Sequence, residues 1–188
     1  MFELIDNLVK QAAKKFGHNL SVYQPRLGKN SFNEKNLTYN LAFQFESTIN
    51  EKNQNPIAFM EAPFKKAFNS RTNLHIDSIL INESSLVLVE AKRLYHQDKM
   101  LEIESDWERM SSPLLINPIR EKLPNKDIYK LVIAESWSSK ITKWWGYDDT
   151  SLCWNRNVLF KHVGVHPVTK IDGCDINWLY AIEKLAKS

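Results

Sequence analysis

Two acids and one lysine lie close together on a predicted pair of strands. The segments 74–81 and 86–94 are rich in aliphatic side chains, and the polar tetrapeptide between them predicts a turn. If this turn is symmetric, Asp77 lies directly opposite Glu90. Because side chains alternate along a strand, Lys92 lies on the same face as Glu90. The sequence therefore predicts that these three charged side chains converge.

The pairing of Asp77 with Glu90 needs an explanation, because like charges repel when they face each other across two strands. One explanation is a structural ion pair in which Lys92 neutralises the carboxylates, since such networks also occur without any chemical role. The other is a site that uses the carboxylates, and the order of the residues along the chain favours it.

The residues His75-Ile76-Asp77, twelve intervening positions and Glu90-Ala91-Lys92 resemble the PD-(D/E)xK nuclease signature, in which an acid on one strand faces an acid-x-Lys on the next. Ile76 stands where the signature has proline. The order helix, strand, hairpin, helix and strand over residues 37–136 is similar to the restriction-endonuclease-like core. The resemblance implies a metal-dependent endonuclease that hydrolyses DNA phosphodiester bonds.

The resemblance gives each residue of the signature a role. Asp77 and Glu90 would hold Mg²⁺, or Mn²⁺ as its substitute, together with the backbone carbonyl of Ala91. Such an ion neutralises charge on the phosphate and lowers the pKa of its bound water. Lys92 would position the attacking water or stabilise the pentacovalent phosphate. By the same resemblance Glu46 is a fourth catalytic candidate on the preceding helix, and its alternative is a solvent-facing acid.

The apolar pattern predicts the fold that positions these residues. Both faces of the hairpin are apolar near the turn, so helices must cover both faces of the sheet. We expect an α/β fold with a restriction-endonuclease-like three-layer core, in which a mixed sheet with a central hairpin is flanked by helices on both faces. One domain over residues 1–188 would contain a core at about 37–136 and a C-terminal decoration at 137–188.

The remaining elements follow from helical or strand periodicity. The pattern predicts helices at 2–16, 37–49, 97–110, 138–147 and 175–186, further strands at 57–64, 131–134 and 158–165, and a polar loop at 17–36.

Candidate nucleic-acid contacts lie mainly in the C-terminal half. Five of the six tryptophans lie between Trp137 and Trp178, interleaved with basic residues. Because aromatic and basic side chains together can bind nucleic acid, Lys140 and Lys143 are candidate contacts. The alternative is that the tryptophans complete the core. His75 is either a phosphate contact or a hydrogen-bonded neighbour of the site.

Histidine and cysteine spacing does not favour a second metal site. On a strand, His162 and His166 would lie about 13 Å apart, too far to share one ion, so we interpret them as structural. Cys153 and Cys174 are too few for a disulfide framework, and we expect both to be buried thiols.

The amino-acid composition excludes several classes of protein. Hydrophobic residues make up 43% of the chain, and 5 glycines and 7 prolines exclude a collagen-like or low-complexity protein. The absence of an export signal or a long apolar run predicts a cytoplasmic protein without a membrane span. A net charge of +3 means that DNA must be bound by a local patch. A homodimer is a further expectation, and the rival function is a non-catalytic protein of the same fold that binds nucleic acid or a protein partner.

Overall fold

The computed structural model describes the chain except for residues 23–32, 65–73, 149–151, 155–156 and 187–188. Its helices are α1 (Phe2–Val22), α2 (Lys35–Ser47), α3 (Gln97–Arg109), α4 (Pro113–Lys122) and α5 (Ser139–Trp145). Its strands are β1 (Ile57–Phe64), β2 (Leu74–Ile81), β3 (Ser85–Arg93), β4 (Asp127–Ser136), β5 (His162–Ile171) and β6 (Cys174–Lys184). No helix within the described ranges is long and apolar enough to cross a membrane.

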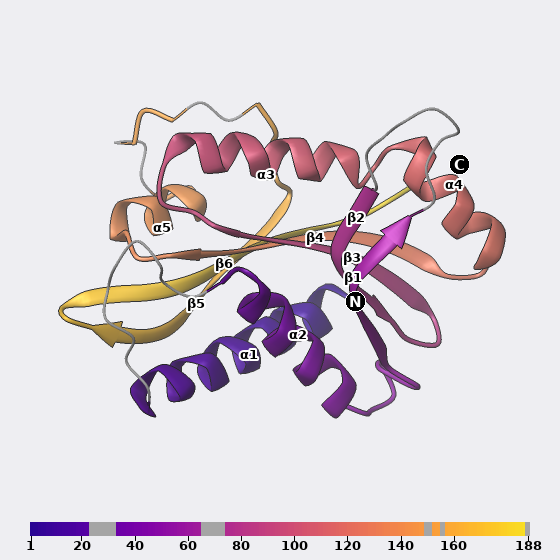
Figure 1. Ribbon diagram of the computed structural model, residues 1–188, viewed down its shortest axis with the longest axis horizontal. Coiled ribbons are helices and arrows are strands. Elements are labelled where there is room, and N and C mark those ends of the chain that lie inside the picture. Colours follow the sequence, from indigo (N-terminus) through magenta and orange to yellow (C-terminus); the bar gives the residue numbers. More distant parts are fainter. Residues whose placement is uncertain (23–32, 65–73, 149–151, 155–156, 187–188) are drawn as a thin grey trace.

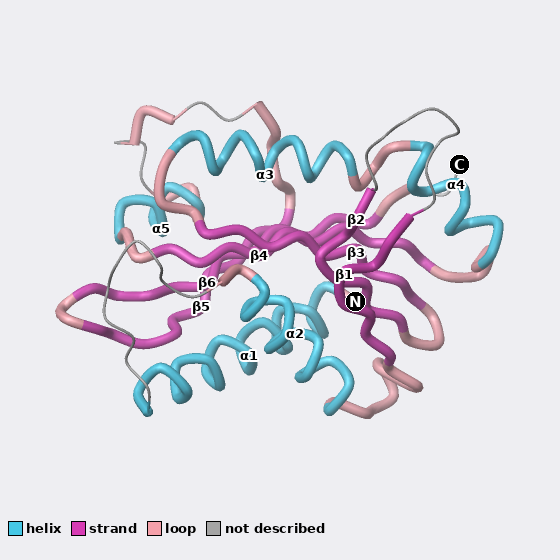
Figure 2. Tube along the Cα trace, in the orientation of Figure 1, coloured by secondary structure: helices cyan, strands magenta, loops and turns pink. Residues whose placement is uncertain are grey.

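The architecture is an α/β fold of three layers. In the described residues six strands form one mixed sheet in the order β1-β2-β3-β4-β6-β5, with β3 and β4 parallel and the other neighbours antiparallel. Helices α1 and α2 cover one face, and α3 lies across the other (Figure 1). The tube view shows the sheet as the middle layer between them (Figure 2). The α/β class and the helices on both faces are therefore confirmed.

The predicted hairpin is confirmed with its predicted register. Strands β2 and β3 pair antiparallel from Ile81 with Leu86 to Ser78 with Val89. The main-chain pairing ends there, and one further step of the same register would set Asp77 opposite Glu90. The turn is closed by the side-chain amide oxygen of Asn82, which accepts hydrogen bonds from the main chain of residues 84 and 85.

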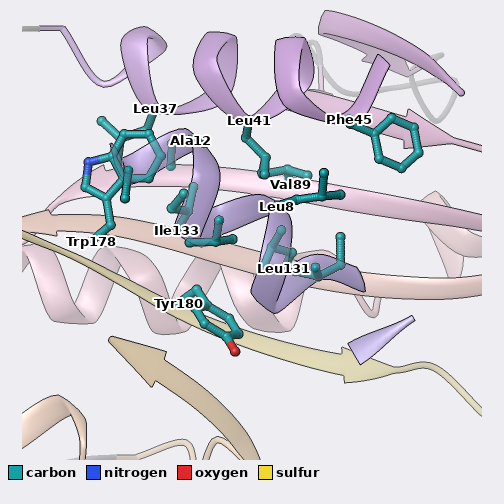
Figure 3. Packing of buried hydrophobic residues seen from close by; sticks show 14 of the residues in the cluster. Leu8, Ala12, Leu37, Leu41, Phe45, Val89, Leu131, Ile133, Trp178 and Tyr180 are labelled. Carbon is teal, nitrogen blue, oxygen red and sulfur yellow. The ribbon is translucent and has the colours of Figure 1, made fainter. Parts of the chain in front are cut away.

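Two apolar layers hold the helices on the sheet. On one face, Leu8 and Ala12 of α1 and Leu37 and Leu41 of α2 pack with Val89 and other strand residues (Figure 3). In each helix the two residues are four apart and therefore lie on one side. On the other face, apolar residues of α3, α4 and α5 pack against the opposite side chains of the same strands. The two layers leave β3 covered on both sides, as the sequence pattern predicts.

The first helix is longer than the sequence pattern predicts. It continues through Gly17 to Val22, so the predicted loop at 17–36 is wrong at its start, while residues 23–32 lie outside the described part. A Cβ atom at Gly17 would lie 2.1 Å from the carbonyl oxygen of Val168. Glycine lets the helix backbone approach β5, and this packing outweighs the low helix propensity of the residue.

The C-terminal segment is a strand, so the predicted helix at 175–186 is wrong. Strand β6 lies between β4 and β5, and it belongs to the central sheet instead of decorating it. Asp172 and Gly173 connect β5 to β6 with φ of 48° and 81°, the left-handed conformations that two-residue hairpin turns require. The predicted strand at 158–165 accordingly begins later, at His162.

Helix α4 is absent from the predicted elements. Pro113 lies just beyond the predicted helix at 97–110, and it opens α4 because proline suits the first turn of a helix. The predicted helices at 97–110 and 138–147 are confirmed as α3 and α5. Ser138 caps α5 by accepting a hydrogen bond from the Ile141 amide.

The histidines and cysteines have simple structural settings. His166 Nε2 lies 2.8 Å from Asp6 Oδ1, and the His162 ring packs against Phe2, which agrees with structural roles for both histidines. Cys153 and Cys174 are exposed, so the prediction of buried thiols is wrong. Cys174 lies directly after the tight turn between β5 and β6, where the chain meets solvent.

Candidate active site

The candidate site begins where strands β2 and β3 part. The main-chain pairing of β2 with β3 ends at Ser78 and Val89. Beyond this pair, the carboxylate of Asp77 accepts the hydrogen bond of the Ala91 amide, at 2.8 Å. Two residues further along β3, Glu34 Oε1 accepts a hydrogen bond from the Arg93 amide at 3.0 Å. Two successive outward amides of one strand edge are therefore bound by carboxylates.

Glu90 and Lys92 lie together on the sheet face that α3 covers. The Lys92 Nζ atom lies 3.9 Å from Glu90 Oε2 and 2.8 Å from Asp106 Oδ2. The side chain of Glu90 is only 3% exposed and that of Lys92 15%. The predicted convergence of Glu90 and Lys92 is confirmed, and Asp77 is near enough for its charge to act on Glu90.

Two residues of α3 complete the cluster, and sequence reasoning missed both. Arg109 Nη2 lies 2.6 Å from Glu90 Oε1 and 2.8 Å from Asp106 Oδ1, while its Nη1 donates a hydrogen bond to the His75 carbonyl at 2.8 Å. Asp106 and Arg109 are three residues apart, so they share one side of the last turn of α3. In the sequence, the three-residue spacing of Asp106 and Arg109 around the apolar Trp107 was the signal that could have indicated a charged pair on this helix.

Burial and neighbouring charge set the protonation of the two central groups. Burial, followed by the charges of Asp77 and Asp106, raises the pKa of Glu90 to about 8, against the opposing effects of Arg109 and Lys92. Burial alone would lower the pKa of Lys92, but its hydrogen bond to Asp106 and the surrounding carboxylates raise it above the ordinary value. Lys92 is therefore a permanent cation near neutral pH.

The structure places Glu46 away from this cluster. Its Oε1 accepts a hydrogen bond from the Ala58 amide at 2.9 Å, and Ala58 pairs with Leu80. Because Leu80 is three residues from Asp77, the two positions are separated by about 10 Å along the sheet. Glu34, at the opposite end of α2, is the acid that reaches the strand edge beside the cluster.

The predicted nucleic-acid contacts lie in different places. The side chain of His75 is exposed, and only its carbonyl oxygen takes part in the cluster. Lys140 and Lys143 are exposed on α5, which packs against β4, β5 and β6 instead of the hairpin. Trp144 and Trp145 are both buried, which supports the alternative that the tryptophans complete the core.

The donor set suits a hard divalent cation in its chemistry. Carboxylate and carbonyl oxygens are the ligands that Mg²⁺ prefers, and Asp77, Glu90 and the Ala91 carbonyl supply them. Within the described residues, no group of three or more acidic, histidine or cysteine side chains is arranged to hold a metal. A metal here would therefore depend on the two carboxylates and the carbonyl, with water as the remaining ligands.

The fold and the cluster together define a three-layer α/β protein with a buried acid–lysine site at the point where its central hairpin opens. Comparison of the chain with protein-family models, with curated proteins and with solved structures gives no match.

Proposed function

We propose that the protein is a metal-dependent endonuclease of the restriction-endonuclease-like fold that hydrolyses DNA phosphodiester bonds. The observation that carries the proposal is the meeting of Asp77, Glu90 and Lys92 where β2 and β3 part. The mixed sheet with a central hairpin between helical layers supports it, because the PD-(D/E)xK signature belongs to that arrangement. The choice of DNA as the substrate rests on the resemblance of the motif to the PD-(D/E)xK nuclease signature.

In this proposal Asp77, Glu90 and the Ala91 carbonyl would hold Mg²⁺. The bound ion would neutralise charge on the phosphate and lower the pKa of a water molecule. Asp77 is already oriented, since one of its oxygens is fixed by the Ala91 amide at 2.8 Å. Glu90 lies deeper and must lose its proton to bind an ion, because burial and the neighbouring acids favour its neutral form.

Lys92 would act as a fixed positive charge and hydrogen-bond donor. Its ammonium group has three donors, of which one contacts Asp106 at 2.8 Å. The remaining donors can orient the attacking water or stabilise the negative charge that develops on the phosphate. Because its pKa is raised, Lys92 does not serve as a general base in this proposal. Asp106 is a positioning residue that holds the lysine.

A second function is favoured by the ion pairs of the same cluster. Lys92 and Arg109 already contact Glu90 and Asp106, as they would in a non-catalytic protein of this fold that binds nucleic acid or a protein partner. In that case the cluster only stabilises the fold, and a divalent ion would have no effect on it.

Divalent-ion exchange on bound DNA tests the proposal. We expect Ca²⁺ to support DNA binding without turnover, because it tolerates irregular coordination but organises the attacking water less well. Addition of Mg²⁺ or Mn²⁺ to this complex should then start cleavage, which denaturing gels would follow over time. DNA binding that persists without cleavage in all three metals would favour the non-catalytic function.

A further inference from the structure

Arg109 is more exposed than Glu90, Lys92 and Asp106, and it contacts the buried carboxyl group of Glu90. Its side chain is 28% exposed, compared with 16% for Asp106 and 3% for Glu90. It is the last residue of α3, so its side chain extends from the end of the helix over the site. Of these three side chains, Arg109 is therefore the most accessible from solvent.

The guanidinium group of Arg109 contacts a carboxyl oxygen of Glu90 that would be a ligand for a bound cation. Arg109 Nη2 lies 2.6 Å from Glu90 Oε1, at contact distance. The other oxygen of Glu90 faces Lys92 at 3.9 Å. A divalent ion bound to Glu90 while Arg109 stays in place would lie beside a permanent positive charge, and their repulsion would weaken metal binding.

A phosphodiester offers Arg109 a replacement partner. Guanidinium groups bind phosphate oxygens through two parallel hydrogen bonds, as they bind carboxylates. Asp106 would continue to attract Arg109 from the same turn of α3 and keep it near the site. If Arg109 exchanges its contact with Glu90 for a contact with the phosphate, the side chain of Glu90 becomes free for the metal. The guanidinium group still has a partner.

We propose that Arg109 is a phosphate-binding residue that couples metal binding to substrate binding: it leaves Glu90 when the DNA phosphate arrives, and the metal then takes its place. The inference rests on the proposed nuclease function and adds to it an order of assembly. Metal and DNA therefore bind cooperatively, and each raises the affinity of the other by the same factor.

The test measures Mn²⁺ affinity of the full chain without DNA, by electron paramagnetic resonance of the free ion at one pH. Arg109→Gln should bind Mn²⁺ about tenfold more tightly than the wild type. Arg109→Lys keeps the charge and should retain the weak binding of the wild type. Lys99→Gln is the matched control, because Lys99 is also on α3 and pairs with Glu102, which is not part of the cluster.

The second arm measures DNA affinity with and without Ca²⁺. In the wild type Ca²⁺ should tighten DNA binding about tenfold, and in Arg109→Gln this gain should largely disappear. Equal Mn²⁺ affinities for Arg109→Gln and the wild type, with an unchanged Ca²⁺ effect on DNA, would overturn the role of Arg109. If no variant binds Mn²⁺ with or without DNA, the metal site itself is absent, and the proposed function fails together with this inference.

Discussion

Lys92→Ala should lower the rate of DNA cleavage at least about a hundredfold, as removal of a preorganised donor to a developing negative charge does elsewhere. The Lys92 side chain is 15% exposed and its ammonium group is fixed by Asp106 at 2.8 Å, so water cannot reproduce its position after the side chain is removed. Single-turnover cleavage in Mg²⁺ measures the loss directly. DNA affinity in Ca²⁺ should change much less, because the effect concerns the chemical step.

The control for Lys92→Ala is Lys99→Ala, which removes a lysine of α3 that pairs only locally with Glu102 in the described contacts. Its cleavage rate should equal that of the wild type. The losses in Glu90→Gln and Lys92→Ala should not add in the double variant, because the two groups act as one unit. Near-normal turnover by Lys92→Ala would remove the lysine from the mechanism.

Glu90→Gln should stabilise the metal-free protein at pH 8 relative to the wild type. Because folding raises the pKa of Glu90 from 4.5 to about 8, its contribution to the free energy of unfolding is fully present below pH 4.5. This contribution is lost as the pH rises through about 8, where the fold must hold a buried carboxylate. Glutamine does not titrate, and the difference should reach a few kcal/mol at about 1.4 kcal/mol per pKa unit.

Urea unfolding of both proteins at pH 5 and pH 8, without divalent metal, measures this difference. Glu102→Gln is a suitable control, since Glu102 is an exposed acid of α3 outside the cluster. The stability gain of Glu90→Gln over the wild type should grow between the two pH values. A difference that stays constant would show that Glu90 is not strained in its charged form.

The core of the site was predictable because it depends on local rules. A short polar turn fixes the hairpin register, and strand alternation then decides which side chains share a face. These rules alone predict that Asp77 lies near Glu90 and that Lys92 shares the face of Glu90.

The rest of the cluster depends on how helices dock. Glu34 and Glu46 lie at opposite ends of α2, and only the path of the helix over the sheet decides which end approaches β3. Arg109 enters the site because α3 ends above Glu90. Neither outcome follows from periodicity, which gives the face of a helix but not its position along a strand.

The C-terminal error has a different cause. Residues 178–182 are all buried, and a fully buried apolar run fits a helix or a central strand equally well. The Asp172-Gly173 turn was the signal that could have decided between them, since this pair is typical of two-residue hairpins.

Plasmid cleavage by the wild type and Asp77→Asn, each in millimolar Mg²⁺ and in excess EDTA, tests whether Asp77 holds a divalent ion that cleaves DNA. The asparagine keeps an oxygen for the Ala91 amide, so the variant should fold, but it loses the charge that holds an ion. The wild type should give nicked and linear DNA in Mg²⁺ only. Equal cleavage in EDTA, equal cleavage by Asp77→Asn, or an inert wild type in both Mg²⁺ and Mn²⁺ would show that the protein is not a metal-dependent nuclease of this kind.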